Sequence, residues 1–159
     1  MPIENLWWRE SKKEWEDIGK VWVSRNLRCA THIKDSNKET CYIITTIKDA
    51  ANDVVESVKI EKTIYVYRGH DIEAKEIELI INSFGGTEIT VYETTIENDA
   101  VDRELKCHVV VDADVSDVLE ELSNAKNVVQ LKNALRELRR RLRIASKSAA
   151  EYIASVSSL

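Results

Sequence analysis

The cysteine and histidine residues offer the most reactive side chains in this sequence, because thiolates and imidazoles bind zinc and serve in catalysis. They are few: Cys29, His32, Cys41, Cys107 and His108. A zinc site needs three or four such ligands converging in a tetrahedron. Within each close pair the spacing along a predicted strand is odd, so the two side chains point to opposite faces of the sheet. We therefore predict no metal site, and three reduced cysteines. The pair most worth testing for a disulfide is Cys29 with Cys41, on neighbouring strands of a predicted hairpin.

Sequence motifs that mark known chemistry are missing. The chain contains no GxxxxGK[ST], GxGxxG, HExxH or GxSxG segment. Its four glycines are Gly19, Gly69, Gly85 and Gly86, which leaves no glycine-rich loop to cradle a phosphate. We expect a protein that is not an enzyme and that holds no cofactor.

One loop, residues 67–71, combines groups that suit a small ligand. It follows a predicted strand and opens a predicted helix, where Arg68 and the helix N-terminus could hold an anion and His70 could titrate near neutrality. In a parallel sheet, ligands bind outside the carboxyl ends of the strands. Neighbouring strand ends would then add Thr46, Lys48 and Thr94. Each residue also has a structural explanation as a turn or solvated residue, so this site rests on analogy of fold.

Three tryptophans recur every seven residues near the N-terminus. This spacing of Trp8, Trp15 and Trp22 predicts a helix over residues 4–24 with the indoles on one face. Such a face could stack nucleic-acid bases or bind a partner, although tryptophans more often enter the core because each buries a large apolar area. The C-terminal segment is the obvious partner for this helix.

The C-terminal segment carries the clearest pattern. From residue 127 to 157, apolar or small residues alternate at spacings of three and four, which predicts one amphipathic helix about 45 Å long. A helix of that length would protrude from a compact domain. We predict an interaction seam formed by its leucines, Leu131, Leu135, Leu138 and Leu142.

Basic residues concentrate in the same segment. The net charge of the chain is −5, yet residues 127–159 carry seven basic and two acidic residues, which leaves the first 126 residues strongly acidic. The arginines could bind nucleic-acid phosphates. The acidic remainder would repel nucleic acid, so we favour a solvated or ion-paired face for them. The arginines in question are Arg136, Arg139, Arg140 and Arg143.

The order of predicted elements favours an α/β (or α+β) fold. We predict strands at 27–33, 40–47, 63–67, 88–96 and 105–111, and helices at 49–58, 71–84 and 115–124. Residues 40–96 thus alternate β-α-β-α-β, typical of a small, mostly parallel sheet with right-handed crossover helices. An N-terminal helix and the long C-terminal helix would complete one domain of 159 residues. No apolar stretch is long enough to span a bilayer and no secretory signal is evident, so we expect a cytoplasmic protein.

These observations lead to three functional hypotheses. The first is a non-catalytic interaction or assembly protein, homo-oligomeric or bound to a protein partner through its Trp- and Leu-lined helices. The second is a regulatory nucleic-acid-associated protein that uses the arginine-rich helix. The third is a small-ligand or nucleotide-binding α/β domain centred on residues 67–71. A membrane partner is not expected.

Overall fold

The computed structural model describes residues 2–3, 6–10, 14–17, 21–32, 38–49, 51, 54–68, 71–83, 85–126, 128–142 and 146–157. Side chains are described only within residues 39–156. All statements below concern these parts of the chain.

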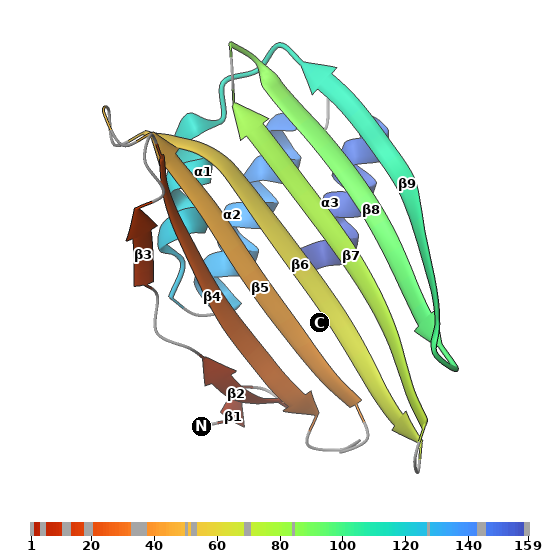
Figure 1. Cartoon of the computed structure of the whole chain (residues 1–159). Coiled ribbons are helices and arrows are strands. Elements are labelled where there is room, and N and C mark those ends of the chain that lie inside the picture. The colour runs from red at the N-terminus through yellow and green to blue at the C-terminus, as the bar shows by residue number, and fades with distance from the viewer. Residues whose placement is uncertain are drawn as a thin grey trace.

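A large antiparallel sheet forms most of the protein (Figure 1). Its nine strands are β1 (Pro2–Ile3), β2 (Leu6–Glu10), β3 (Glu14–Asp17), β4 (Val21–His32), β5 (Lys38–Asp49), β6 (Val55–Arg68), β7 (Asp71–Ser83), β8 (Thr87–Glu97) and β9 (Ala100–Val111). The strands follow the order β1-β2-β4-β5-β6-β7-β8-β9, and β3 also pairs with β4. From β4 to β9 each strand therefore pairs with the next one in the chain, which makes a long meander.

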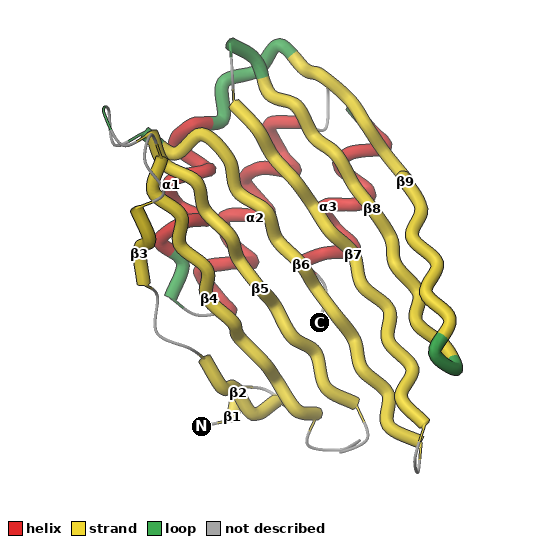
Figure 2. The backbone as a smooth tube through the Cα atoms, in the orientation of Figure 1, coloured by secondary structure: helices red, strands yellow, loops and turns green. Residues whose placement is uncertain are grey.

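The chain ends in three helices that cover one face of this sheet. They are α1 (Ser116–Asn124), α2 (Val128–Leu142) and α3 (Lys147–Ser157). Figure 2 shows them as a single layer behind the strands. The core lies between the two layers, and its largest fully buried side chains are Tyr42, Ile60, Leu79, Ile81, Ile89, Leu119, Leu122, Leu131, Leu135, Leu138, Leu142 and Ile153.

The predicted parallel sheet with crossover helices is wrong. Every strand pairing that the structure describes is antiparallel, and residues 40–96 run through β5, β6, β7 and β8 without a helix. Residues 71–84, predicted as a helix, contribute β7, and half of residues 49–58 lie in β5 and β6. Only two residues separate Arg68 from Asp71, which suits a hairpin, whereas a parallel crossover needs a dozen or more residues.

The predicted N-terminal helix is also wrong. Residues 6–10, 14–17 and 21–24 belong to β2, β3 and β4. The tryptophans therefore lie on three different strands: Trp8 is opposite Ala30, Trp15 is opposite Ser24, and Trp22 is opposite Lys48. A spacing of seven residues places side chains on one helix face only if one helix contains them all, and here separate strands do. The tryptophan side chains lie outside the part of the chain that the structure describes, and so does the interaction surface that they were predicted to form.

The long C-terminal helix is replaced by two shorter ones. α2 ends at Leu142 and α3 begins at Lys147, and the two helices pack against each other. The leucine seam is fully buried: Leu131 is 1% exposed, and Leu135, Leu138 and Leu142 are 0% exposed. The four leucines thus lie in the core of this chain, and their predicted role as an interaction seam stays a prediction.

Candidate functional site

The face of the sheet opposite the helices is covered by no described element. In Figure 1 the helices lie behind the strands, and no described segment crosses in front of β4 to β9. Strand residues alternate between the two faces. Since Leu79 and Val91 enter the core, their neighbours Glu78 and Tyr92 lie on the uncovered side. We call this surface of β5 to β9 the open face.

Cross-strand register arranges the open face in rows. One row across the sheet consists of Ile43, Glu61, Glu78, Tyr92 and Leu105. The next row consists of Cys41, Thr63, Glu76, Thr94 and Arg103. Charged and apolar side chains from five strands thus become neighbours across the sheet, although the ends of each row lie far apart in the sequence.

Apolar side chains are exposed along β9, at one edge of the open face. Val101 is 66% exposed, Leu105 is 57% exposed and Val110 is 69% exposed. All three lie on the open face, because they are opposite Ile96, Tyr92 and Glu88. They are spaced four and five residues apart along the strand, and exposed apolar side chains that share one face are a feature of interaction sites.

Three carboxylates gather in the centre of the open face. The carboxylate oxygens of Glu61, Glu76 and Glu78 lie within 4.8 Å of one another. Lys59 forms an ion pair of 3.2 Å with Glu61, and the Arg103 guanidinium donates a hydrogen bond of 2.8 Å to Glu78.

Glu76 is the carboxylate that these two cations leave out. It accepts a hydrogen bond of 3.3 Å from the Thr63 hydroxyl, and no ion pair with it is found among the described residues. The cluster therefore carries one more carboxylate than cations.

The carboxyl groups of Glu76 and Glu78 titrate differently. Burial raises the pKa of Glu76, and so do its hydrogen bond with Glu78 and the negative charges of Glu61 and Glu78. Burial would also raise the pKa of Glu78, but hydrogen bonds from Arg103 and Glu76, together with the positive charge of Arg103, lower it overall. Glu76 is therefore the carboxyl of this pair that takes up a proton first as the pH falls.

Arg103 is held in place from two directions. Its guanidinium carbon lies 3.8 Å from the centre of the Tyr92 ring, in addition to the hydrogen bond with Glu78. This arrangement fixes the guanidinium beside the carboxylates and close to the exposed Leu105 on the same strand.

Carboxylate oxygens are ligands for hard cations such as calcium. Here Lys59 and Arg103 already place positive charge against Glu61 and Glu78, so the charge that a metal would supply is partly present. We assign no metal to this cluster. Sequence reasoning missed the cluster because residues 71–84 were predicted as a helix. The alternation of Ile77, Leu79 and Ile81 with Glu76, Glu78 and Ile80 was the signal for a strand.

The predicted ligand-site residues do not converge. Thr46 is 1% exposed on the helix side of β5, and Lys48 lies 3.9 Å from Glu120 of α1. Thr94 is buried on the opposite face, in the row of Glu76. Arg68 ends β6, and because β5 and β6 are antiparallel it lies at the other end of the sheet from Lys48. His70 lies outside the described residues.

The predicted nucleic-acid residues lie mainly on the outer side of α2. Arg136, Arg139 and Arg140 are exposed. Arg140 donates to Glu137, whereas no ion pair with Arg136 or Arg139 is found in the described part of the chain. Arg143 lies outside that part. Of the predicted arginines, Arg140 is therefore ion-paired, while Arg136 and Arg139 are exposed to solvent.

The prediction of three reduced cysteines is wrong for Cys41. Cys41 is disulfide-bonded, and Cys107 is a free, buried thiol whose pKa is raised by burial. The backbone of Cys29, the remaining cysteine in the sequence, lies directly opposite Cys41. His108 projects on the open face, 3.5 Å from Glu88.

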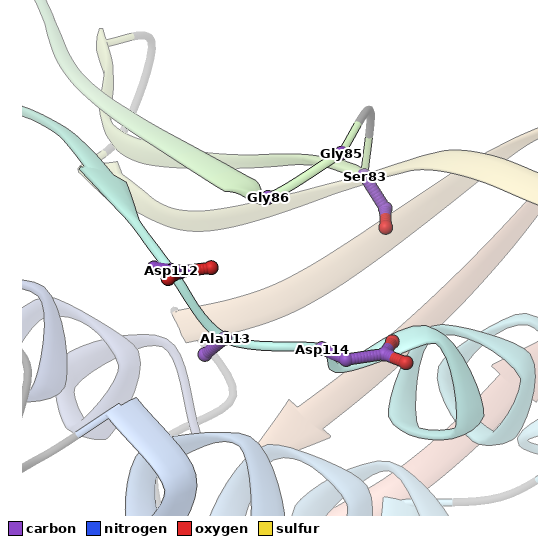
Figure 3. Close-up of a pocket in the computed structure, with 6 residues that line it drawn as sticks. All are labelled: Ser83, Gly85, Gly86, Asp112, Ala113 and Asp114. Carbon is purple, nitrogen blue, oxygen red and sulfur yellow. The ribbon is translucent and has the colours of Figure 1, made fainter.

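A pocket of about 300 Å³ lies where the turn between β7 and β8 meets the link to α1 (Figure 3). Its lining residues are Ser83, Gly85, Gly86, Asp112, Ala113 and Asp114. The Asp114 carboxylate accepts hydrogen bonds from the backbone and side chain of Ser116, at the start of α1. Gly85 has a φ of 72°, which a turn requires. These residues serve the turn and the helix start, and we assign no catalytic role to the pocket.

Comparison of the chain with protein-family models, with curated proteins and with solved structures finds no match. Among the described residues, no helix has the length and apolar character needed to cross a membrane.

Proposed function

We propose that this protein is a non-catalytic assembly protein that binds a second copy of itself through the open face. The single observation that carries the proposal is the exposed apolar edge of that face, formed by Val101, Leu105 and Val110. The helices already cover much of the other face of the sheet (Figure 1).

Burial of this edge supplies a driving force. More than half of each of these three side chains is exposed to water. Covering them in an interface contributes about 1–2 kcal/mol each, in proportion to the apolar area removed from water. The neighbouring Tyr92 is only partly buried and would extend the same apolar area.

The contact uses the face of β9 and not its edge. β9 has an irregularity in register at Lys106, and it carries Asp102, Arg103, Glu104 and Lys106. Bulges and charged side chains are features by which edge strands avoid pairing with strands of other molecules. A partner that packs on the face meets the apolar side chains without adding a strand to the sheet.

A second candidate function, binding of nucleic acid, rests on Arg136 and Arg139, which are exposed on α2. It ranks lower because Arg140 is already paired with Glu137, whereas nucleic-acid binding relies on several cations that neutralise phosphates.

The test is the molar mass of the protein in solution, measured by light scattering over a range of concentrations. We expect the wild-type mass to exceed that of one chain and the double variant Val101→Lys/Leu105→Lys to be monomeric. Val54→Lys is the matched control, since Val54 is 50% exposed but precedes β6, away from this edge. A wild-type protein that stays monomeric at all concentrations would refute the proposed function.

A further inference from the structure

We propose that the open face binds the outer, arginine-bearing surface of α2 from a second copy, so that copies join head to tail. This inference rests on the proposed function and names the surface that the second copy presents. Two observations on the described residues support it: the charge of each surface and the dimensions over which the charges extend.

The open face is acidic. Its carboxylates outnumber its lysines and arginines by five to two: Glu39, Glu61, Glu76, Glu78 and Glu88 against Lys59 and Arg103. Both cations are already committed to carboxylates of the central cluster. Glu76 accepts a hydrogen bond from the neutral Thr63 hydroxyl and has the like charges of Glu61 and Glu78 beside it. A cation from a partner would relieve that repulsion.

The outer surface of α2 is basic. Arg136, Arg139 and Arg140 lie together on the exposed side of this helix, because Arg139 and Arg140 follow Arg136 by three and four residues, close to one helical turn. We call these three residues the basic stripe. The leucines of α2 point the other way and are buried. Arg136 and Arg139 form no ion pair among the described residues, so their charges are available to a partner.

The basic stripe is shorter than the acidic part of the open face and fits within it. At about 1.5 Å per residue, the basic stripe extends about 6 Å along the α2 axis. On the open face, Glu76 and Glu88 lie about 20 Å apart along the strands, since Glu88 is opposite Asn82, six residues after Glu76. A helix aligned with the strands can therefore place Arg136 and Arg139 above the carboxylates of the central cluster.

The two surfaces lie on opposite sides of the molecule, because the sheet and the helices form two layers (Figure 1). A twofold pairing of two open faces would bring acidic surfaces together. Pairing of an open face with a basic stripe avoids this repulsion between like charges. After each copy is added, one open face and one basic stripe remain unpaired at the two ends of the assembly. Such contacts produce open chains or rings instead of closed twofold dimers.

The experiment mixes two variants that are each defective in one surface. The first is Val101→Lys/Leu105→Lys, which disrupts the apolar edge, adds positive charge to the open face and retains the basic stripe. The second is Arg136→Glu/Arg139→Glu, which retains the open face. We expect each variant alone to be monomeric by light scattering and an equimolar mixture to form a dimer of one copy of each. Matched melting temperatures and circular dichroism spectra establish that both variants fold.

A control for charge is Lys126→Glu/Lys147→Glu, which changes the net charge equally at exposed lysines outside α2. We expect this control to associate like the wild-type protein. Raising NaCl from about 0.05 to about 0.5 M should weaken wild-type association about tenfold or more, because exposed charges are screened within a few ångströms at high salt.

The outcomes separate the two proposals. If the Arg136→Glu/Arg139→Glu protein keeps the wild-type mass while the open-face variant is monomeric, the proposed function stands and the head-to-tail contact is refuted. A mixture of the two variants that stays monomeric also refutes the head-to-tail contact and leaves the proposed function standing. If wild-type protein never associates, the proposed function itself fails.

Discussion

Tyr42 and Lys62 are direct cross-strand neighbours, and their side chains together hold the end of the last helix. Tyr42 on β5 lies opposite Lys62 on β6, on the helix side of the sheet. The Tyr42 hydroxyl donates a hydrogen bond of 3.0 Å to the carbonyl of Val156, and Lys62 Nζ donates one of 3.1 Å to the carbonyl of Ser155. The last carbonyls of a helix have no partner within the helix, so the sheet supplies donors to α3.

Removal of the Tyr42 hydroxyl should destabilise the protein. Tyr42→Phe keeps the buried ring, which is 1% exposed, but leaves the Val156 carbonyl without this donor. We expect a loss of about 1 kcal/mol in the free energy of unfolding, measured by urea denaturation. Tyr67→Phe, on the exposed end of β6, is the control and should change stability little. Equal effects of the two changes would contradict the capping role.

Lys62 should make the stability depend on pH in the alkaline range. Burial and the nearby charge of Lys132 lower the pKa of Lys62 to about 8. The unfolded chain therefore binds a proton on this lysine between pH 8 and about 10.5, where the folded protein does not, and stability rises with pH through that window. Below about pH 8, Lys62 is charged in the folded protein, and the cost of burying that charge lowers the free energy of unfolding in full.

Comparison with Lys62→Met isolates this contribution from other titrating groups. As the pH rises from about 8 to about 10.5, we expect the free energy of unfolding of the wild type to increase relative to that of the variant. Urea titrations at several pH values supply the measurement. A difference that does not change with pH would show that Lys62 titrates normally.

Thr46 should be replaceable by valine with a gain in stability. Its hydroxyl is buried on the helix side of β5 and has no hydrogen-bond partner among the described residues. A buried hydroxyl without a partner costs about 1–3 kcal/mol, and valine has nearly the same shape. We expect Thr46→Val to raise the melting temperature in a calorimetric scan. Thr45→Val, on the opposite face, is the control, and a lower melting temperature for Thr46→Val would mean that its hydroxyl is satisfied.

Reduction should weaken the sheet near Cys41. Because Cys41 is disulfide-bonded, the mass of the native chain should be lower than that of the reduced chain by two hydrogen atoms. We expect dithiothreitol, or Cys41→Ser, to lower the free energy of unfolding by about 2–4 kcal/mol. Cys107→Ser should leave the mass difference intact, since that thiol is free. An identical mass before and after reduction would contradict the disulfide.

Local pattern alone located several elements. The predicted helix at 115–124 corresponds to α1, and the heptad pattern correctly predicted helix over α2 and α3. The predicted strands at 40–47, 63–67, 88–96 and 105–111 lie within β5, β6, β8 and β9. These segments have a single dominant period, either that of a helix or that of a strand, so the sequence by itself determined their type.

Tertiary structure decided the segments in which both periods are present. In residues 71–83, Ile77, Leu79 and Ile81 alternate as in a strand, while the same region also has the spacing of a helix. Pairing of β7 with β6 on one side and β8 on the other supplies hydrogen bonds along both edges of the strand. That context favours the strand, and with it the whole sheet becomes antiparallel.

The open face follows from the same pairings. Glu61 and Glu78 are neighbours only because β6 and β7 form a hairpin in one register. A shift of one residue would turn Glu78 toward the helices and Leu79 toward water. The sequence by itself determined that the leucines of α2 form an apolar seam, since helical spacing alone places them on one face. Which surface covers that seam, and which carboxylates and apolar side chains remain on the other side of the sheet, depended on strand pairings between distant residues, and only the tertiary structure decides these.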